Sequence, residues 1–557
     1  MIRSLSLPIF AGLFLTTGCV VEDPVGNQNP SPQFDGGALS LDAGPPPSFC
    51  ETLGLNERPF DSTAPSVLQR RQPAGDFTVP TIASGTFILS ERWTGCETYL
   101  FMPHNTTISD LDNNTVWSVA DGIPRLIEKS PRNAHYFFVV TGRDSPGTRA
   151  AVQAMQGRID DAIVNMDDTD REHWKSHLHV VSQASRALEG LVDDMFKSDV
   201  ARFGFAIDRF QRLRGLGNLA AVDAHNAQLQ AQERWPWERR LYGLAYEAQY
   251  FNFEMTREER LETQNVTLVS VLGGDVIEQF EEATINLPDA STMASFDTLE
   301  IDILMECPNR EAAEPSNCGP WDYLAHFWLW DEGTESWLEA ARFITTYHRE
   351  SRWVVDASHA LAWLQEGGER RVKYEWAPAW NKQPTAVTAS LRLYNQGKGM
   401  RPQEIFPLFG THGFNPSIND REPVAVDLPA DLGKVELVAI TTGHGMEAQN
   451  CAEFCRHSHH YTVGNETFVQ AFNEPGDQSQ CAENSGEGTV PNQWGTWWFG
   501  RGGWCPGREV YPFIADVTEQ VSAGGSTVVS YEAKLNNGPP IEGAGTINHN
   551  SWLVIHR

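Results

Sequence analysis

The sequence predicts a multidomain chain in which an N-terminal α/β domain precedes two all-β antiparallel domains of jelly-roll (β-sandwich) type. At 557 residues the chain is too long for one hydrophobic core, so two to four domains are expected. Up to about residue 260, apolar β-rich runs alternate with helical patterns, which is typical of α/β layers. Beyond it, short alternating strands such as 298–305 and 437–441 are separated by Gly-, Pro- and Asn-rich turns, which indicates all-β sandwiches.

In the N-terminal part, the alternation predicts a partly parallel sheet. Strands are expected at 98–102, 135–141, 177–181 and 203–207, and helices at 116–129, 147–162 and 183–196. The element order resembles a thioredoxin-type fold, with Trp93-Thr94-Gly95-Cys96 near the place of that family's redox motif. Only one Cys is present there, so thiol exchange is not expected. Residues 209–260 are charged and predicted to be helical, forming a solvated surface that packs one domain onto the next.

The first residues predict export. Arg3 precedes an apolar run over residues 5–15 that is too short to span a bilayer, and Thr-Thr-Gly-Cys follows it. Residues 1–18 therefore resemble a lipoprotein-type signal peptide with Cys19 as the lipidated residue, and a plain cleaved signal peptide is the alternative. Residues 19–65 are predicted to be a flexible Pro/Gly-rich tether. The expected location is the bacterial outer membrane or cell surface through this lipid anchor only, otherwise the medium.

Charge and cysteine content limit which classes of partner and which kinds of site the chain can have. A net charge of −31 argues against nucleic acid, because phosphate would be repelled. Of nine cysteines, eight remain beside Cys19, and an even number in an exported chain predicts disulfides. None forms a CxxC pair, which counts against a zinc site or a redox dithiol. The domain at 66–260 shows no phosphate loop, metal-spaced cluster or nucleophile elbow, and is expected to be accessory in a monomeric chain.

Three motifs lie in the two predicted jelly rolls, 261–400 and 401–557. In the first, Glu-Cys-Pro-Asn at 306–309 precedes Cys-Gly-Pro-Trp-Asp-Tyr at 318–323, and a disulfide there would fix the Trp-Asp pair. The second is Cys-Ala-Glu-Phe-Cys at 451–455, and the third is Arg-Gly-Gly-Trp-Cys-Pro-Gly at 501–507. Two acids and a guanidinium thus lie on or beside loops that disulfides would hold rigid, as pre-organised catalytic groups require.

Together these motifs resemble, in order, those of the bacterial peptide-N-glycosidase F family, the peptide-N4-(N-acetyl-β-glucosaminyl)asparagine amidases. The resemblance covers a little over half of the chain. It implies two jelly rolls side by side with the active site at their interface. It also implies four disulfides, Cys307–Cys318, Cys451–Cys455, Cys481–Cys505 and, with the remaining pair, Cys50–Cys96.

The resemblance further implies the site residues. The catalytic acids would be Asp322, Glu453 and Glu375, with Asp322 at the scissile amide. The substrate-binding residues would be Arg501, Trp504, Trp376, Tyr323 and His444. Tyr323 departs from the family, which usually has Arg after the catalytic Asp, and this puts the glycan preference in doubt.

The implied reaction hydrolyses the amide between N-acetylglucosamine and asparagine, converting Asn to Asp and releasing the glycan as a glycosylamine. The partners would be N-linked glycoproteins or glycopeptides. The reaction needs an activated water, stabilisation of the oxyanion and a proton for the leaving nitrogen, so no cofactor and no metal are expected. Clustered carboxylates repel one another, so one should keep a raised pKa while another stays ionised.

Two other functions compete. A glycan-binding surface lipoprotein that has lost catalysis would keep the same fold. A copper-dependent monooxygenase-like protein would use His457, His459 and His460. Alternation along a strand puts His457 and His459 on one face and His460 on the other, and the His at 177 and 179 fall in the α/β region, so this set is a poor ligand group.

Overall fold

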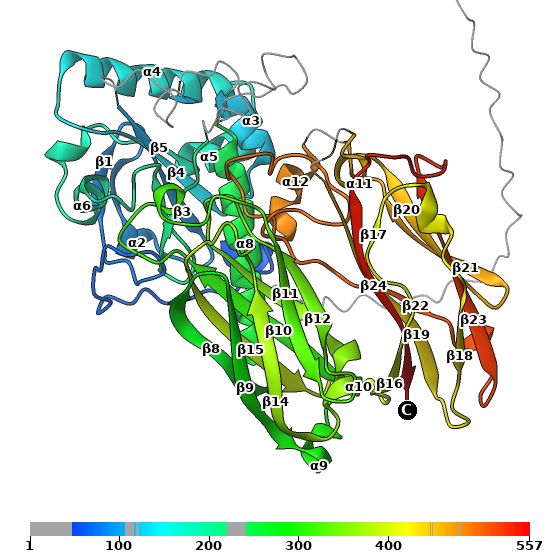
Figure 1. The fold of residues 1–557 in the computed structure, drawn as a ribbon. Coiled ribbons are helices and arrows are strands. Elements are labelled where there is room, and N and C mark those ends of the chain that lie inside the picture. The colour runs from blue at the N-terminus through cyan, green and yellow to red at the C-terminus, as the bar shows by residue number, and fades with distance from the viewer. Residues whose placement is uncertain are drawn as a thin grey trace, which may run out of the picture.

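The computed structural model describes residues 47–105, 116–117, 122–219, 241–445, 447, 449–476 and 479–557. They form an N-terminal α/β domain and two β-sandwiches, coloured blue to cyan, green, and yellow to red in Figure 1. The predicted signal peptide, Cys19 and most of the predicted tether lie outside the described residues. Within the described part of the chain, no helix has the length and apolarity needed to cross a membrane.

A mixed five-stranded sheet organises the N-terminal domain. Its strand order is β5 (Leu178–Val180), β4 (Ala134–Val140), β3 (Thr98–His104), β6 (Phe205–Ile207) and β7 (Leu213–Gly215). The first three strands are parallel and the last two are antiparallel, so the partly parallel sheet is confirmed. The thioredoxin-type likeness stays a prediction. A separate hairpin, β1 (Thr78–Thr81) and β2 (Gly85–Ile88), leads into the short α2 (Leu89–Arg92).

Local capping explains the helices around this sheet. α4 (Pro146–Ile163) begins at Ser145, whose hydroxyl accepts from the Thr148 N–H. α3 (Gly122–Lys129) tolerates Pro124 because the first turn needs no N–H donor there. The helix predicted at 183–196 is divided, because Gly190 has φ 76°, into a 3₁₀ turn and α6 (Leu191–Lys197). α5 (Asp168–His177), capped by Asp167, was not predicted, since its strongly polar sequence hides the helical period.

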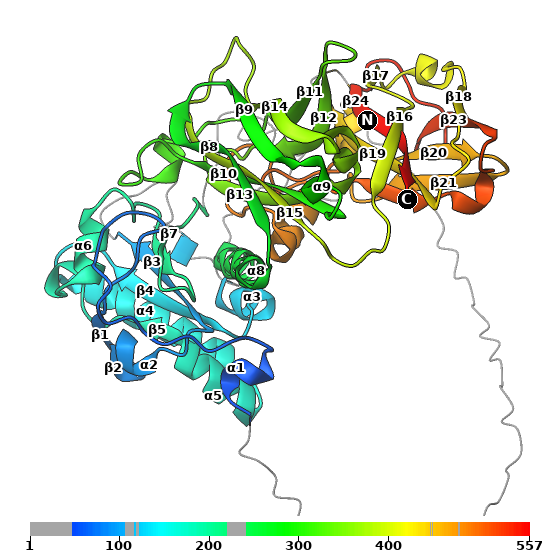
Figure 2. The same cartoon turned by 90° about the horizontal axis from the view of Figure 1, so that it is seen from below.

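α8 (Gly243–Thr263) corrects the expectation of a solvated helical surface. Twelve of its residues are buried, including the carboxylates of Glu247 and Glu254. Figure 2 shows the helix end-on between the N-terminal sheet and the two sandwiches. Burial on all sides makes α8 the element through which the three domains meet.

The first sandwich has two four-stranded antiparallel sheets. In one sheet the order of neighbouring strands is β13 (Ser351–Asp356), β10 (Thr298–Glu306), β15 (Thr385–Tyr394) and β8 (Thr267–Ile277). In the other sheet the order is β12 (Ser336–Ile344), β11 (Leu324–Asp331), β14 (Gly367–Glu375) and β9 (Phe280–Asp289). Apolar side chains of both inner faces, from Ile301 to Phe343 and Val387, form one core.

The second sandwich repeats this plan. One sheet runs β16 (Pro402–Pro407), β24 (Thr546–His556), β19 (Lys434–His444), β22 (Phe513–Asp516), with β17 (His412–Gly413) also on β24. The other runs β18 (Val424–Asp427), β23 (Ser526–Leu535), β20 (His457–Val463), β21 (Glu466–Phe472). β20 alternates strictly between buried and half-buried residues, as a strand over a core requires. The all-β expectation for the C-terminal part is confirmed.

An apolar seam joins the two sandwiches. Ile344 at the end of β12 packs against Val438 and Ile440 of β19 and Trp552 of β24, with Trp504 in the same cluster. Arg342 of β12 crosses the seam and donates to the Asn548 carbonyl (2.6 Å) and the Thr442 hydroxyl (3.0 Å). The start of β11 and the end of β12 are therefore held against the end of β19, and the candidate site lies there.

Candidate active site

Asp322 lies in the turn between the Cys307–Cys318 loop and β11. Hydrogen bonds on both sides fix its backbone: the Thr345 hydroxyl donates to the Trp321 carbonyl (2.8 Å) and accepts from the Tyr323 N–H (2.8 Å). Trp321 is also held by the Gln383 side chain, which accepts from its N–H at 3.0 Å. The position of this carboxylate is thus set by strand β12 and by the segment before β15.

Glu453 lies in the one-turn helix α11 (Cys451–Phe454), which the Cys451–Cys455 disulfide closes. α11 packs directly on the end of β19, and Gly443 makes this possible, since a Cβ there would lie 1.8 Å from the Ala452 carbonyl oxygen. A Cβ on Gly502 would lie 2.4 Å from the same carbonyl oxygen, so this position also requires glycine. The Gly502 N–H donates to the Glu453 carbonyl (2.8 Å). The loop that carries Arg501 is thereby docked onto α11.

Arg501 joins the two acids. Its Nε donates to Glu453 Oε1 at 3.0 Å, and its Nη2 lies 3.6 Å from Asp322 Oδ2. The guanidinium is fully buried and also donates to the Thr496 hydroxyl (2.7 Å) and the Phe499 carbonyl (3.2 Å). One acid comes from each sandwich, so the site forms only where the two sandwiches meet.

Tyr347, in the loop after β12, completes this group and was missed by sequence reasoning. Its hydroxyl lies 3.2 Å from the Thr496 hydroxyl, and its hydrogen bond to Asp322 lowers the pKa of that carboxyl. Tyr347 and Thr496 belong to no motif of the sequence. No spacing could have identified them, because they reach Asp322 and Arg501 only through the packing of the two sandwiches.

Burial dominates the electrostatics of the two acids. It raises the pKa of Asp322 to about 6, against the opposing effects of Arg501 and Tyr347. Burial and the neighbouring Asp322 charge raise the pKa of Glu453 to about 7, again against Arg501. Two carboxyls around one guanidinium would thus share about one proton near neutral pH, which is the state that acid–base chemistry needs.

These shifts predict how stability depends on pH. Both folded-state pKa values lie above those of exposed carboxyls, so between about pH 4 and 7 the folded protein holds protons that the unfolded chain has released. Stability should therefore fall as the pH rises from about 4 to about 7 and level off above that. Asp322→Asn should raise the stability at pH 8 by about 3 kcal/mol, or Tm by several degrees. The difference should vanish near pH 4 in thermal melts, and a lower Tm for the variant at pH 8 would contradict the assignment.

Three of the expected substrate contacts require correction because the side chains are buried. Trp376 lies in the core of the first sandwich, stacked on Tyr374 with its Nε1 donating to the Gln383 carbonyl (3.0 Å), so it offers no face to a sugar. Trp504 is also buried: its Nε1 donates to the Gly443 carbonyl (2.8 Å), and the Arg501 guanidinium lies 4.6 Å from its ring centre. The Arg501 side chain has no exposed surface either, and its guanidinium faces the Asp322 and Glu453 carboxylates.

His444 and Glu375 also differ from expectation. His444 stacks on the Trp504 ring at 4.8 Å, and burial lowers its pKa well below the usual range, so it is a neutral packing partner. Glu375 pairs across the sheet with His326, is one-third exposed and lies 3.2 Å from Lys373 Nζ. Among the described residues, no hydrogen bond or ion pair joins Glu375 to Asp322, Glu453 or Arg501. Its role as third acid stays a prediction.

Exposed aromatic rings lie beside Asp322 instead. The Tyr323 hydroxyl accepts from the Asn381 amide (2.7 Å), and the Tyr323 ring meets Trp380 edge-on at 5.9 Å. Trp380 is 79% exposed and Trp321 48%, which is unusual for tryptophan. Flat apolar faces of this kind are available to a sugar ring. Trp380 was missed because a single Trp between strands gives no signal without the fold.

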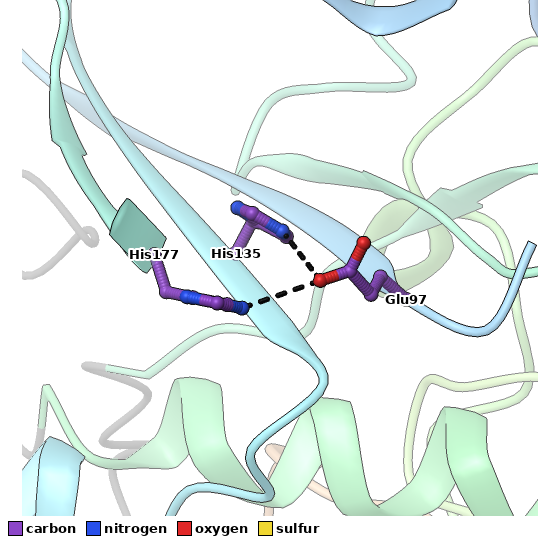
Figure 3. Close-up of side chains that lie close together, drawn as sticks. All are labelled: Glu97, His135 and His177. Carbon is purple, nitrogen blue, oxygen red and sulfur yellow. Dashed lines mark hydrogen bonds and ion pairs between the residues drawn. The ribbon is translucent and has the colours of Figure 1, made fainter. Parts of the chain in front are cut away.

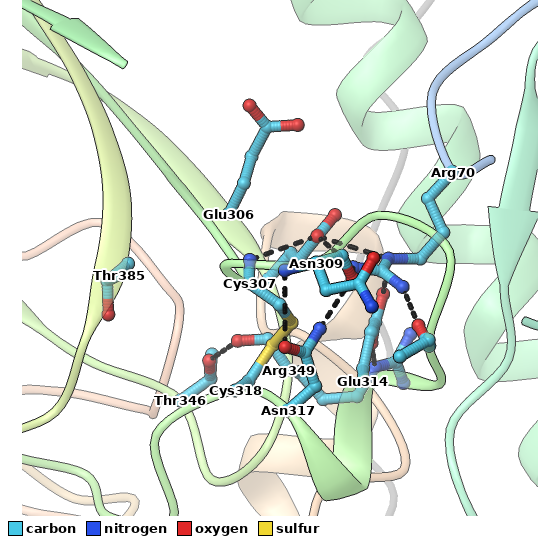
Figure 4. Close-up of a disulfide and its surroundings, with 12 residues drawn as sticks. Arg70, Glu306, Cys307, Asn309, Glu314, Asn317, Cys318, Thr346, Arg349 and Thr385 are labelled. Atoms are coloured by element: carbon cyan, nitrogen blue, oxygen red, sulfur yellow. Dashed lines mark hydrogen bonds and ion pairs between the residues drawn. A yellow bond between two sulfur atoms is a disulfide. The ribbon is translucent and has the colours of Figure 1, made fainter. Parts of the chain in front are cut away.

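The N-terminal domain supports the disulfide loop that precedes Asp322. Figure 4 shows Arg70 beside the Cys307–Cys318 disulfide, where its guanidinium donates to the Asn309 carbonyl (3.0 Å) and to Glu350 (2.9 Å). Glu350 in turn accepts from the Cys307 N–H (3.1 Å). All four expected disulfides are present and confirmed: Cys50–Cys96, Cys307–Cys318, Cys451–Cys455 and Cys481–Cys505.

The histidines after Cys455 contact one another and neighbouring protein groups. His457 and His459 face the core and are buried, as alternation predicts. Their rings contact each other (Nδ1 to Nε2, 3.0 Å), while the outer nitrogens meet the Ala452 carbonyl (2.9 Å) and the Tyr531 hydroxyl (2.7 Å). Every ring nitrogen of this pair is therefore satisfied within the protein.

The chain is similar in sequence to a known protein family and to a curated protein. Residues 414–554 match the family model described as peptide-N-glycosidase F, C terminal. A curated relative, peptide-N(4)-(N-acetyl-β-D-glucosaminyl)asparagine amidase F of Elizabethkingia miricola, is 26% identical over 297 residues, covering 48% of this chain and 75% of the relative.

Two solved structures are also similar. PNGase F, a glycosylasparaginase from Flavobacterium meningosepticum, has 20% identity and a TM-score of 0.40, covering 52% of this chain and 96% of its own. PNGF-II has 13% identity and a TM-score of 0.39, covering 54% and 67%. The family match falls in the second sandwich, and over those residues the chain is similar to peptide-N-glycosidase F.

Proposed function

We propose that this chain is an amidohydrolase that cleaves the amide between N-acetylglucosamine and asparagine in N-glycoproteins or glycopeptides. The observation that carries the proposal is the pairing of Asp322 and Glu453, one from each sandwich, around the buried Arg501. The curated relative is named for this reaction on asparagine-linked N-acetylglucosamine, and the matched residues include Glu453.

The geometry supports a division of labour between the two acids. Asp322 is the more exposed carboxylate and has the lower pKa, so near neutral pH it is the one that is ionised and can accept a proton from water. The hydroxide equivalent attacks the amide carbonyl. Glu453, with a pKa of about 7, keeps a proton in reserve. As the C–N bond breaks, a proton passes to the departing nitrogen, leaving an aspartate side chain and a glycosylamine.

Arg501 is a positioning residue in this scheme. Burial raises the pKa of both carboxyls, and the positive charge of Arg501 opposes this effect. Asp322 can therefore still ionise near neutral pH. The rigid fork of Arg501 also fixes the separation of the two carboxylates. Tyr347 and Thr496 hold Asp322 and the guanidinium from the other side.

The proposal is tested on a panel of defined glycopeptides incubated with the full chain in water enriched in heavy oxygen. Mass spectrometry should find the intact glycan released and one heavy oxygen in an aspartate at the former asparagine. An endoglycosidase would leave one sugar on the asparagine. A protein that only binds glycan would shift no mass, and either outcome rejects the amidase.

The exposed tryptophan predicts a specificity effect. Trp380→Ala should raise KM about tenfold with little change in kcat, because a ring contact with a sugar contributes roughly 1–1.5 kcal/mol to binding. Trp380→Phe keeps an aromatic face and should retain most of the affinity. Initial rates over a range of glycopeptide concentrations check this. An unchanged KM for Trp380→Ala would remove Trp380 from the binding surface.

We further infer that the chain is exported. Four disulfides persist only in an oxidising compartment, which supports this. Lipidation at Cys19 and a monomeric state remain part of the proposal. Palmitate labelling of intact cells, compared between the native chain and Cys19→Ala, tests the anchor.

A further inference from the structure

Three metal-ligating side chains converge in the N-terminal domain, far along the chain from Asp322. Glu97 directly precedes β3, His135 is the second residue of β4, and His177 ends α5 directly before β5. These three strands are parallel neighbours, so their starts lie at the same edge of the sheet. Figure 3 shows both imidazoles aimed at one carboxylate oxygen.

The donor atoms are close enough to share one ion. Glu97 Oε1 lies 3.0 Å from His135 Nε2 and 3.2 Å from His177 Nε2, and all three ligand atoms lie within 4.8 Å of one another. A tetrahedral zinc ion with bonds of about 2.0–2.1 Å places its ligand atoms roughly 3.3 Å apart. The cluster therefore needs only small side-chain shifts to bind zinc.

Hydrogen bonds on the far side orient each ligand. The Thr94 hydroxyl donates to Glu97 Oε2 (2.9 Å), which leaves Oε1 facing the histidines. His177 Nδ1 lies 2.8 Å from the His173 carbonyl oxygen, and His135 Nδ1 lies 3.0 Å from His179 Nε2. Ligating histidines in metal sites use their second nitrogen in this way.

The second nitrogen of His177 is occupied on the far side of the ring. His177 Nδ1 lies 2.8 Å from the His173 carbonyl oxygen and 2.9 Å from the Ser176 hydroxyl. Nε2 is therefore the nitrogen that faces Glu97 Oε1, at 3.2 Å.

Buried nitrogens nearby have no other explanation in the described part of the chain. His173 Nε2 and His179 Nδ1 are buried there without a hydrogen-bond partner. The His173 ring stacks on His177 at 3.9 Å, beside the three ligand atoms that lie within 4.8 Å of one another. Five polar side chains thus gather at one place that a packed apolar core would not need.

The cluster is closed to solvent by a disulfide-held segment. Cys50 of α1 (Phe49–Thr52) bonds to Cys96, the residue before Glu97. Phe49 lies over the rings of His173 and His177 at 6.0 and 5.9 Å. A closed site of this kind is suited to structural zinc, since catalytic zinc keeps an open position.

We propose that Glu97, His135 and His177 form a structural zinc site that fixes the start of β3, β4 and β5 together. The sequence predicts no metal here, because the ligands come from three separate segments, at or just before the starts of three strands, and share no spacing. The site is independent of the amidase proposal, since none of its residues belongs to the group around Asp322.

The test uses the full chain, stripped of metal with a chelator and titrated with zinc against a chromophoric competitor. One zinc per chain should bind with Kd below roughly 1 µM, and saturating zinc should raise Tm by about 5 °C or more. Cobalt(II) in place of zinc should give the intense visible bands of a tetrahedral site. Neither readout depends on glycopeptide cleavage.

His177→Gln and Glu97→Gln should each lose the bound zinc and the rise in Tm. His460→Gln is the matched control, because His460 lies on the outer face of β20, paired with Ser458. The proposal fails if the native chain binds no zinc in this range, with Tm unchanged, as a purely hydrogen-bonded cluster would. It also fails if both cluster variants keep one equivalent or if His460→Gln loses it. The native-chain titration decides even where a variant does not fold.

Discussion

Asp322→Asn should lower the rate of glycan release by at least about 10³-fold, or about 4 kcal/mol in the activation barrier. Asparagine fills the same space and can still accept from Tyr347, but it cannot take a proton from water. Nor can it share a proton with Glu453 across Arg501. The chemistry should stop while the architecture of the site remains.

The measurement is the initial rate of Asn-to-Asp conversion in one glycopeptide, followed by mass spectrometry. Asp331→Asn is the matched control: Asp331 ends β11 in an exposed turn, where it accepts from the Gly333 N–H (3.1 Å), and its loss should leave the rate unchanged. A thermal melt of each variant excludes unfolding as the cause. Asp322→Asn retaining more than about a tenth of the native rate would remove Asp322 from the proposed chemistry.

Glu453→Gln should behave differently from Asp322→Asn at the level of pH. Asp322 ionises while Glu453 is still protonated, so Glu453→Gln should leave the acid limb of the rate profile in place. It should remove the basic limb, which the loss of the Glu453 proton would set. This contrast follows from the buried guanidinium, which holds the two carboxyls in one electrostatic unit.

Much of the catalytic group could be predicted from the sequence because it lies in contiguous motifs. Glu453 and Arg501 are marked by cysteines and glycines whose role is local, since Gly443 and Gly502 make room for α11. The strands were predictable where alternation is strict, as in β20. These features depend on near neighbours in the chain, so they can be read without the fold.

What could not be predicted depends on contacts between distant segments. Trp504 lies in a motif and Trp376 was implied by the resemblance, yet the sequence cannot tell a core ring from one that faces a ligand. Tyr347 and Trp380 have no motif and join the site only through packing. The cluster of Glu97, His135 and His177 could not be predicted for the same reason. Neighbouring parallel strands bring these residues together, although they share no spacing in the sequence.

The sequence predicts that residues 209–260 pack one domain onto the next, but not that this contact is a buried ion pair. α8 supplies Glu247, which is fully buried and binds Arg349 of the first sandwich at 3.0 Å. Asn492 of the second sandwich donates to the same Glu247 oxygen (2.8 Å), and Arg349 donates to the Pro491 carbonyl (2.6 Å). One ion pair therefore joins all three domains. It lies two residues from Tyr347, whose N–H donates to Gln493 (2.8 Å).

Arg349→Leu should accordingly destabilise the whole chain by about 3–5 kcal/mol, because it leaves the buried carboxylates of Glu247 and Glu314 without their partner. Tm should fall by roughly 10 °C, as measured by calorimetry. The matched control is Arg132→Leu, which removes an exposed pair with Asp170 and should cost less than about 1 kcal/mol. Equal losses for the two variants would show that the junction contributes no more than a surface contact.

At temperatures where Arg349→Leu is still folded, its glycopeptide cleavage should also drop. The loop that carries Tyr347 would lose its anchor, and Asp322 would lose its fixed partner. A variant that loses stability but keeps the full native rate would separate the junction from the site and limit α8 to holding the domains together.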